Sequence, residues 1–277
     1  MNALPAPEST ADAMRFDGQA VFITGAGGSF GYVAATGFAA LGAEVFGVDI
    51  DEVALNRTLA EVRATGGVMH GLVTDLRRPA DVTRAFETLD ATLGRVDVLL
   101  NLGGKNVPIG RPEVAEVAAW NDILQTNLTS KFLTSQAAAQ RMIAAGRRGS
   151  IVNVSSTAAT SVLNRDSLAY GVSMAGVIQL TRELAVAWAP YGIRVNAIQP
   201  CQFVNPGLQA IIDDPSRASI VERMISGIPM GRMGVAAEIL GPLVFLASSA
   251  AAMVTGITMP VDGGNLAFNA AGTIPTV

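Results

Sequence analysis

Residues 23–31 read ITGAGGSFG, a glycine-rich turn that follows a short apolar run and leads into a segment of helical length. Glycine permits the tight turn and the close approach of backbone N–H groups to a ligand, and the N-terminus of the following helix carries partial positive charge. Such a turn can hold the pyrophosphate of a dinucleotide. The spacing is looser than G-x-G-x-x-G, so the turn alone is weak evidence. We expect cofactor contacts at Gly25, Gly28, Ser29, Phe30 and Gly31.

The turn belongs to a regular alternation of strand-like and helix-like segments. Seven short runs have the pattern of strands, at residues 19–24, 44–49, 68–73, 96–101, 150–155, 193–198 and 257–262. The helix-length segments between them predict a mostly parallel sheet, because parallel neighbours need long crossovers. No linker or fixed repeat divides the chain, so we expect one α/β domain over residues 18–266, with helices on both faces of a seven-stranded sheet. Residues 1–17 and 267–277 are expected to be loose tails.

Glycines mark the expected helix ends. Five of them stand between a helical segment and a strand, where a left-handed residue closes the last turn: Gly42, Gly66, Gly94, Gly149 and Gly192. The stretch after the sixth strand, about 200–234, is too long for a plain connection and contains short helical pieces. Ligands of such sheets bind at the carboxyl ends of the strands, so this stretch is a candidate lid.

Composition argues against several classes of function. A net charge of −4, with only two lysines, argues against nucleic-acid binding. The single cysteine, Cys201, cannot form an internal disulfide, and with the single histidine, His70, it cannot supply a usual zinc site; we expect both to be structural. The longest apolar stretches are too short to span a bilayer, and the N-terminus lacks the cationic start of a signal peptide. We therefore expect a cytoplasmic protein with no metal and no membrane partner.

Asp49 ends the second predicted strand, 24 positions after Gly25. A carboxylate there can accept hydrogen bonds from both adenosine ribose hydroxyls and repels a 2′-phosphate, so it favours NAD over NADP. The turn itself contains no Lys or Arg that would attract that phosphate. The alternative role, capping the next helix, suits Asp51 better.

Eight motifs follow one another along residues 18–266. They are Thr24-Gly25-x-x-x-Ser29-x-Gly31, Asp75 after the third strand, Asn101-Leu102-Gly103-Gly104 after the fourth, Asn127 in TNLTSKF, Ser155-Ser156 after the fifth, Tyr170, GIRVNAIQP, and VDGG near the end. In order and spacing this set resembles the short-chain dehydrogenase/reductase family. The resemblance implies a Rossmann-type sheet that binds NAD, in an enzyme that interconverts a secondary alcohol and a ketone. It implies cofactor contacts at Asp49, Ile50, Asp75, Leu76, Asn101, Gly103, Tyr170, Pro200, Phe203 and Val204, with Asp75 near the adenine and Asn101 supporting the central strand.

By the same resemblance Asn127, Ser156, Tyr170 and Met174 occupy the catalytic positions. The nicotinamide carries the hydride, and the protein must exchange a proton with the alcohol oxygen. Tyr170 is the expected acid/base and Ser156 the expected donor to the substrate oxygen, with Ser155 as the less favoured alternative. Ser156 and Tyr170 are 14 positions apart, one more than the commonest family spacing. Ser29 in the turn, the NLGG run and Pro200-Cys201 are further departures from the family pattern.

Met174 stands one helical turn after Tyr170, where the family has a lysine. An unperturbed tyrosine has a pKa of about 10, and a cation nearby lowers it by ~1 to 3 units, so losing the lysine costs on the order of ten- to a thousandfold in the basic form. Three accounts are open. The natural chain has lysine here and this one was altered; the methionine is natural and Lys105 or Lys131 supplies the cation; or the protein binds its cofactor without redox turnover.

The sequence carries less information about substrate and assembly. Residues 102–112, 157–166 and 201–232 should line the substrate pocket, and their polar side chains indicate a sugar, sugar acid or polyol: Lys105, Asn106, Asn164, Arg165, Gln202 and Asn205. A hydrophobic ketone or acyl substrate stays open, because loop residues are often polar for solvation alone. The fold also allows isomerisation or dehydration with tightly held NAD. Segments 116–145 and 167–189 are apolar on more than one face, which together with the resemblance indicates a homotetramer or a homodimer.

Overall fold

The computed structural model describes residues 9–163 and 166–268. A sheet of seven strands forms its centre, in the order β3-β2-β1-β4-β5-β6-β9. This confirms the predicted Rossmann-type α/β fold, with every neighbouring pair parallel rather than most of them. The strands are Ala20–Thr24 (β1), Glu44–Asp49 (β2), Val68–Val73 (β3), Val98–Asn101 (β4), Gly149–Val154 (β5), Ile193–Pro200 (β6) and Thr258–Val261 (β9).

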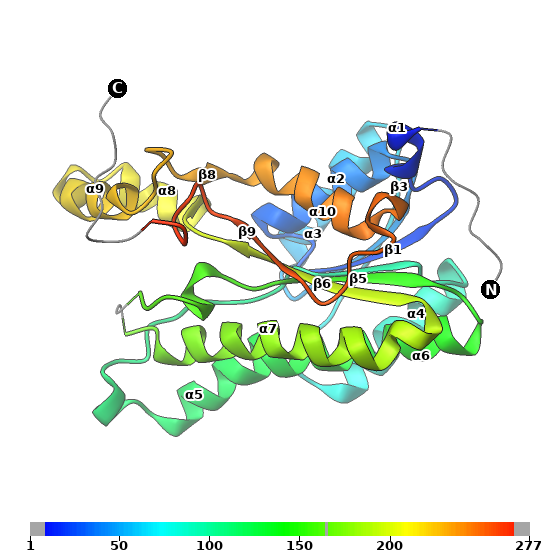
Figure 1. Ribbon diagram of the computed structural model, residues 1–277, viewed down its shortest axis with the longest axis horizontal. Helices are drawn as coiled ribbons and strands as arrows, with labels where there is room; N and C mark the ends of the chain where they lie inside the picture. Colours follow the sequence, from blue (N-terminus) through cyan, green and yellow to red (C-terminus); the bar gives the residue numbers. More distant parts are fainter. Residues whose placement is uncertain (1–8, 164–165, 269–277) are drawn as a thin grey trace.

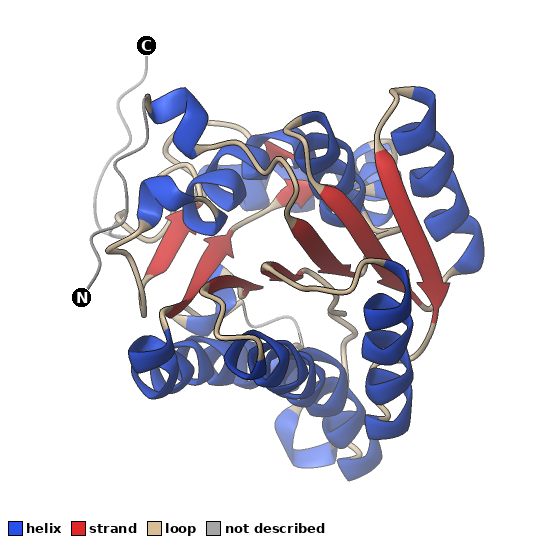
Figure 2. Cartoon of the chain, turned by 90° about the vertical axis from the view of Figure 1, so that its right-hand side faces the viewer, coloured by secondary structure: helices blue, strands red, loops and turns tan. Residues whose placement is uncertain are grey.

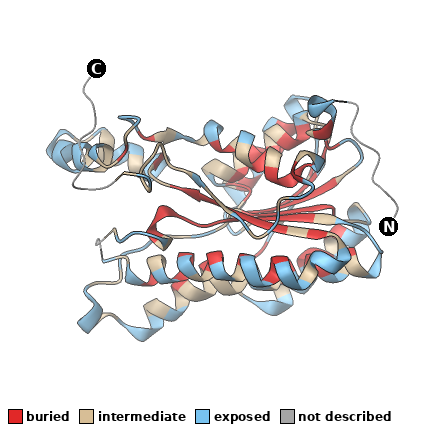
Figure 3. Cartoon of the chain, viewed as in Figure 1, coloured by how far each residue is buried: buried red, intermediate tan, exposed pale blue. Residues whose placement is uncertain are grey.

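Helices cover both faces of the sheet (Figures 1 and 2). One face carries Ser29–Ala40 (α2), Glu52–Ala64 (α3) and Leu240–Ala247 (α10). The other carries Pro79–Thr92 (α4), Ser130–Ala144 (α6) and Leu168–Trp188 (α7), with Val117–Leu124 (α5) beside α7. Buried residues follow the strands and the inner sides of the helices (Figure 3). The strands are apolar on both sides because both sides meet helices.

The strand order reverses beside β1, which lies between β2 and β4. Thr24 at the end of β1 is in register with Val48 of β2 and with Asn101 of β4. The carboxyl ends of these three strands therefore meet at one edge of the sheet. The crossovers lead away from one another there, and a crevice opens at such a switch point.

Two expectations about boundaries need correction. Gly149 does not close a helix; it is the first residue of β5, and Gly146, with φ of +60°, takes the left-handed position at the end of α6. Residues 9–17 are not a loose tail. Thr10–Ala13 forms a short helix (α1), Phe16 is fully buried with its ring centroid 4.6 Å from that of Phe38, and the Ser249 hydroxyl donates to the Ala13 carbonyl at 3.0 Å.

The stretch at 200–234 contains the helical pieces expected of a lid. Phe203–Val204 (β7) pairs in parallel with Gly234–Val235 (β8), and this two-stranded neck joins the two ends of the segment. Between the strands lie Pro206–Ile212 (α8) and Ala218–Ser226 (α9), which contain no buried residue. No helix in the described part of the chain has the length and apolar character needed to cross a membrane.

Candidate active site

The glycine-rich turn is built against the end of β4. Gly25 has φ of +68°, and a Cβ there would lie 2.7 Å from the Cα of Gly103. The Thr24 hydroxyl accepts a hydrogen bond from the Gly103 N–H at 3.1 Å. A Cβ on Gly31 would lie 2.0 Å from the Gly25 carbonyl oxygen, so the first turn of α2 packs directly on the loop. The close approach explains why glycine stands at both positions.

Groups from β2 and α3 hold the rest of the turn. The Asp49 carboxylate accepts from the Gly27 N–H at 2.8 Å, and the Thr58 hydroxyl donates to the Ala26 carbonyl at 3.0 Å. Arg57 donates to the Gly27 carbonyl at 3.1 Å. Helix α2 begins at Ser29, so the N–H groups of its first turn lie at the mouth of the crevice without helical acceptors. This is the arrangement that binds a phosphate anion.

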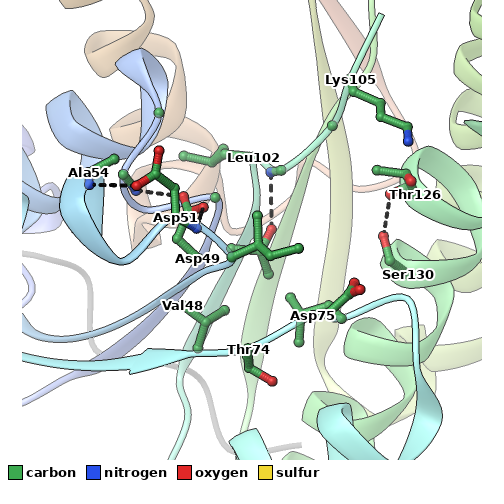
Figure 4. Close-up of a pocket in the computed structure, with 18 of the residues that line it drawn as sticks. Val48, Asp49, Asp51, Ala54, Thr74, Asp75, Leu102, Lys105, Thr126 and Ser130 are labelled. Carbon is green, nitrogen blue, oxygen red and sulfur yellow. Dashed lines mark hydrogen bonds between the residues drawn. The ribbon is translucent and has the colours of Figure 1, made fainter. Parts of the chain in front are cut away.

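A cavity of about 670 Å³ extends along the ends of β1, β2, β3 and β4. Figure 4 shows Asp49 and Asp51 at one end and Lys105, Thr126 and Ser130 at the other. Nine of the predicted cofactor and substrate contacts line it, namely Gly25, Gly28, Ser29, Asp49, Ile50, Asp75, Leu76, Gly103 and Lys105. Its size and elongated lining fit a dinucleotide.

Other predicted cofactor contacts lie outside this lining. The Asn101 side chain is fully buried and bonds Asn153, Ser135 and the Thr134 hydroxyl, so it ties β4 to its neighbours, as expected, and does not reach the cavity. Phe30 and Phe203 pack edge to face at 5.3 Å between centroids, which fixes the lid neck to the turn. The remaining four are also outside the lining: Gly31, Tyr170, Pro200 and Val204.

Four charged side chains form a chain of ion pairs along one wall. Arg77 bonds the Asp75 carboxylate at 2.7 Å and the Asp122 carboxylate at 2.7 Å, and Asp122 in turn pairs with Lys105. The hydrogen bond from Arg77 lowers the pKa of Asp75, and that from Lys105 lowers the pKa of Asp122. Asp75, expected near the adenine, is therefore an ionised group that already has an arginine partner.

The two neighbouring serines after β5 have different tasks. The Ser156 side chain interacts with the Tyr170 phenol and lowers its pKa, whereas the Ser155 hydroxyl donates to the Met174 carbonyl at 2.9 Å. Burial raises the pKa of Tyr170, and the bond with Ser156 offsets only part of the rise. Met174 is 3% exposed and brings no charge to this region. The structure thus pairs Tyr170 with Ser156, and Ser155 with the backbone of α7.

Asn127 is fully buried in a π-helical turn, Gln125–Thr129, between α5 and α6. Its amide oxygen accepts from the Lys105 N–H at 2.8 Å, and its amide nitrogen donates to the Lys105 carbonyl at 2.9 Å. The same nitrogen donates to the Ser173 hydroxyl at 3.1 Å. Asn127 therefore fixes the loop after β4 against the helix that carries Tyr170 and Met174.

The polar residues expected at the substrate pocket have mixed positions. Asn164 and Arg165 lie outside the described residues. Asn205 caps α8 by accepting from the Leu208 N–H at 3.0 Å, and Lys105 is engaged by Asp122. Ser156 and Tyr170 do not line the 670 Å³ cavity. The end of the cavity opposite Asp49 is lined by Lys105, Thr126 and Ser130.

Sequence reasoning missed two cavity residues that carry charge. Arg57 and Arg77 both line the cavity, Arg57 from α3 and Arg77 from the loop after β3. Arg57 is eight positions beyond Asp49 in the sequence, so no cation was expected beside the phosphate-binding turn. Asp51 caps the helix that starts at Glu52, and Arg57 in the second turn of that helix reaches the Gly27 carbonyl. The start of this helix could be predicted from the sequence, but the direction of the Arg57 side chain could not.

Comparison with known proteins agrees with this geometry. The family model described as enoyl-(acyl carrier protein) reductase matches residues 25–265. The solved structure of a putative short-chain dehydrogenase/reductase from Burkholderia xenovorans superposes with a TM-score of 0.87 at 33% identity, over 92% of this chain and 99% of the other. The chain belongs to the short-chain dehydrogenase/reductase family.

Named members of the family include sugar-acid and polyol dehydrogenases. The chain is 35% identical to 2-dehydro-3-deoxy-D-gluconate 5-dehydrogenase of Escherichia coli, over 92% of this chain and 98% of the relative. It is 34% identical to D-threitol dehydrogenase of Mycolicibacterium smegmatis, over 90% and 94%. The NAD⁺-bound structure of a xylitol dehydrogenase superposes with a TM-score of 0.83 at 29% identity, over 90% and 99%. The NADP-bound structure of a putative 2-deoxy-D-gluconate 3-dehydrogenase from Agrobacterium tumefaciens reaches 0.83 at 31%, over 92% and 99%.

Proposed function

We propose that this protein is an NAD-dependent dehydrogenase that interconverts a secondary alcohol and a ketone, with Tyr170 as the acid/base. One observation carries the proposal: beyond the carboxyl end of β5, Ser156 is close enough to the Tyr170 phenol for its side chain to lower the pKa of that phenol. A substrate oxygen placed between two hydroxyls can accept a hydrogen bond from one while exchanging a proton with the other. The named relatives, which are dehydrogenases of alcohols and keto compounds, support the same reaction class.

The residues of the chain would divide the work. NAD, when bound, supplies the site that accepts or gives the hydride. Tyr170 takes the hydroxyl proton of the alcohol in oxidation and returns it to the ketone oxygen in reduction, while Ser156 donates to that oxygen and holds it. Because burial raises the pKa of Tyr170, the phenol is the prevailing form at neutral pH. That form is ready to donate a proton to a ketone; oxidation needs the phenolate, which Met174 does not stabilise.

The cavity fits the cofactor through its backbone geometry. A Cβ at Gly25 or Gly31 would fill the space in which the turn bends, and the N-terminus of α2 faces the same space. The Asp49 carboxylate keeps free lone pairs after its bonds from the Gly27 and Asp51 N–H groups, so it can accept from ribose hydroxyls. Arg57 in the cavity lining acts in the opposite sense, since it could pair with a 2′-phosphate. We propose NAD rather than NADP as the cofactor, because the carboxylate of Asp49 lies at the end of the strand, where the adenosine ribose is expected.

A polyol, sugar or sugar acid is the proposed substrate class. The support is the polar loop after β4 and the activities named for the relatives, which act on D-threitol and on 2-dehydro-3-deoxy-D-gluconate. We also propose a homo-oligomer, a tetramer or a dimer, because Val117 of α5, Phe132 of α6 and Val186 of α7 are exposed apolar side chains on one helical layer.

The test is a substrate screen with the purified protein. D-Threitol, galactitol, xylitol and gluconate derivatives are offered with NAD and, separately, with NADP, and reduction of the nicotinamide is followed by absorbance. Dissociation constants of NADH and NADPH are measured by fluorescence in parallel. We expect tighter binding of NADH and oxidation of at least one polyol, lost by about a hundredfold or more in Tyr170→Phe with NADH binding retained. Equal turnover by Tyr170→Phe would refute the acid/base assignment.

A further inference from the structure

Lys131 is a buried cation that the family pattern does not explain. It lies on α6 one turn after Asn127, its side chain is 2% exposed, and its ammonium donates to the Gly103 carbonyl. Burial lowers its pKa to about 8. A buried ammonium is expensive unless it is fully paired, and an apolar side chain of similar length would fill the same space at no such cost. A charge retained in this position therefore needs a partner.

The ammonium of Lys131 has no charged partner among residues 9–163 and 166–268. An ammonium has three N–H donors. Within the described residues one of them has an acceptor, the neutral carbonyl of Gly103, and no carboxylate lies within ion-pair distance. Lys105, the other lysine, differs because its charge is balanced by Asp122. Of the two lysines, Lys131 alone has an uncompensated charge and spare donors in the part of the chain that the structure describes.

The ammonium lies beside the cofactor cavity, although Lys131 itself is not in the lining. Gly103, its acceptor, and Ser130, its neighbour in sequence, both line the cavity. One turn earlier on the same helical run, Asn127 bonds Ser173, the residue before Met174 on α7. Lys131 and Met174 thus project from two helices that are joined by a hydrogen bond beside the site.

We propose that Lys131 supplies, from α6, the positive charge and the N–H donors that the family has on α7 at position 174. Its ammonium donates to the bound dinucleotide and so holds the cofactor in place beside Tyr170. This inference rests on the proposed function, and it selects one of the open accounts of Met174: a methionine is tolerated on α7 because the cation has moved to the neighbouring helix.

Three variants test the transfer of charge: Lys131→Met, Met174→Lys, and the two combined. Lys131→Met keeps the length of the side chain and removes the charge. We expect it to weaken NADH binding by about ten- to a hundredfold, the worth of charge-assisted hydrogen bonds. Turnover should fall as well, because a nicotinamide that is held less firmly is less well placed beside Tyr170. The urea midpoint should stay or rise, because an unpaired buried charge has been removed.

The combined variant separates an electrostatic role from a structural one. Lysine at 174 restores a charge near the site without restoring the bond to Gly103, so NADH binding and turnover should recover relative to Lys131→Met. Met174→Lys alone should raise neither NADH affinity nor turnover above the parent values, because a second ammonium near Lys131 is repelled by the first. Unchanged NADH binding in Lys131→Met, or loss that the combined variant does not recover, would overturn the proposal.

The proposed function and this inference fail separately. If the parent protein binds NADH but oxidises none of the alcohols, or if Tyr170→Phe keeps full turnover, the proposed reaction is wrong, and the NADH dissociation constants of the same variants still decide the role of Lys131. If Tyr170→Phe abolishes turnover while Lys131→Met alters neither NADH binding nor rate, the reaction stands and the inference about Lys131 is wrong.

Discussion

Ser155 and Ser156 form a matched pair for testing the site, because they are adjacent in sequence and differ in what they touch. Each is buried, 2% and 8% exposed, and each makes a hydrogen bond to the backbone. Ser155 donates to the Met174 carbonyl at 2.9 Å, and Ser156 accepts from the Ala158 N–H at 3.2 Å. Of the two, Ser156 is the residue whose side chain lowers the pKa of the Tyr170 phenol.

Replacing either serine by alanine should cost similar stability. Loss of one buried side-chain to backbone hydrogen bond, or of one cap, amounts to about 1 kcal/mol. For a chain of this size that is a drop of roughly 2 to 4 °C in the unfolding midpoint. The similar losses make each variant the folding control for the other.

Their effects on turnover should differ widely. Ser156→Ala removes a donor to the substrate oxygen, which typically costs on the order of a hundred- to a thousandfold in kcat. Ser155→Ala leaves that donor in place, so its kcat should stay within about threefold of the parent value, because its loss is confined to packing against α7. The assay is steady-state alcohol oxidation, alongside thermal unfolding of both variants. Equal losses of kcat at equal stability would show that the assignment of roles to the two serines is wrong.

Two further predictions concern the turn and the buried lysine. Gly31→Ala should abolish measurable NADH binding, because its Cβ would lie 2.0 Å from the Gly25 carbonyl oxygen. Gly28→Ala places its Cβ 3.4 Å from the same oxygen, so its affinity for NADH should stay within a few-fold of the parent value. Fluorescence titration measures both, and equal affinities would contradict the packing argument. The lowered pKa of Lys131 means that the folded protein releases this proton more readily than the unfolded chain. The cost of burying the ammonium is therefore fully present below a pH of about 8 and is relieved as the pH rises toward about 10.5. Urea unfolding should therefore show stability rising over that window by about 2 to 3 kcal/mol more in the parent than in Lys131→Met, and parallel curves would show that the lysine is not held in a desolvated site.

The strands could be predicted from the sequence because they are buried on both faces. The run 20–24 is apolar up to Thr24 and is buried along its whole length. The runs 44–49 and 68–73 mix Val, Phe, Met and Leu with glycine and polar residues, and the structure places strands over the same residues. The prediction of a loose N-terminal tail was wrong for residues 9–17, because the sequence there has no recognisable pattern. Phe16 is a lone aromatic in a polar, proline-rich stretch, and no periodic pattern indicates that it packs against Phe38 of α2.

The site was predictable where it depends on motif order and unpredictable where it depends on side-chain partners. Asp49, Gly25 and Asn127 were recognisable from their places after strands and in a helix. The sequence could not show that Asp122 would neutralise Lys105, because the two residues lie on different elements and meet only in the fold. Nor could it show which serine faces Tyr170, since a shift of one residue reverses the direction of a side chain in extended backbone.

The neck formed by β7 and β8 affects the entropy of closing the cleft. Its strands bring residues 203 and 235 together before any ligand arrives, and Phe30 holds Phe203 against the phosphate-binding turn. Much of the loop-closure entropy is therefore lost when the chain folds. If residues 205–233 close over a ligand, we expect binding to pay only for ordering them on this base. Helices α8 and α9 bury no residue of their own, so hydrogen exchange should be fastest there in the free protein and should slow most on binding.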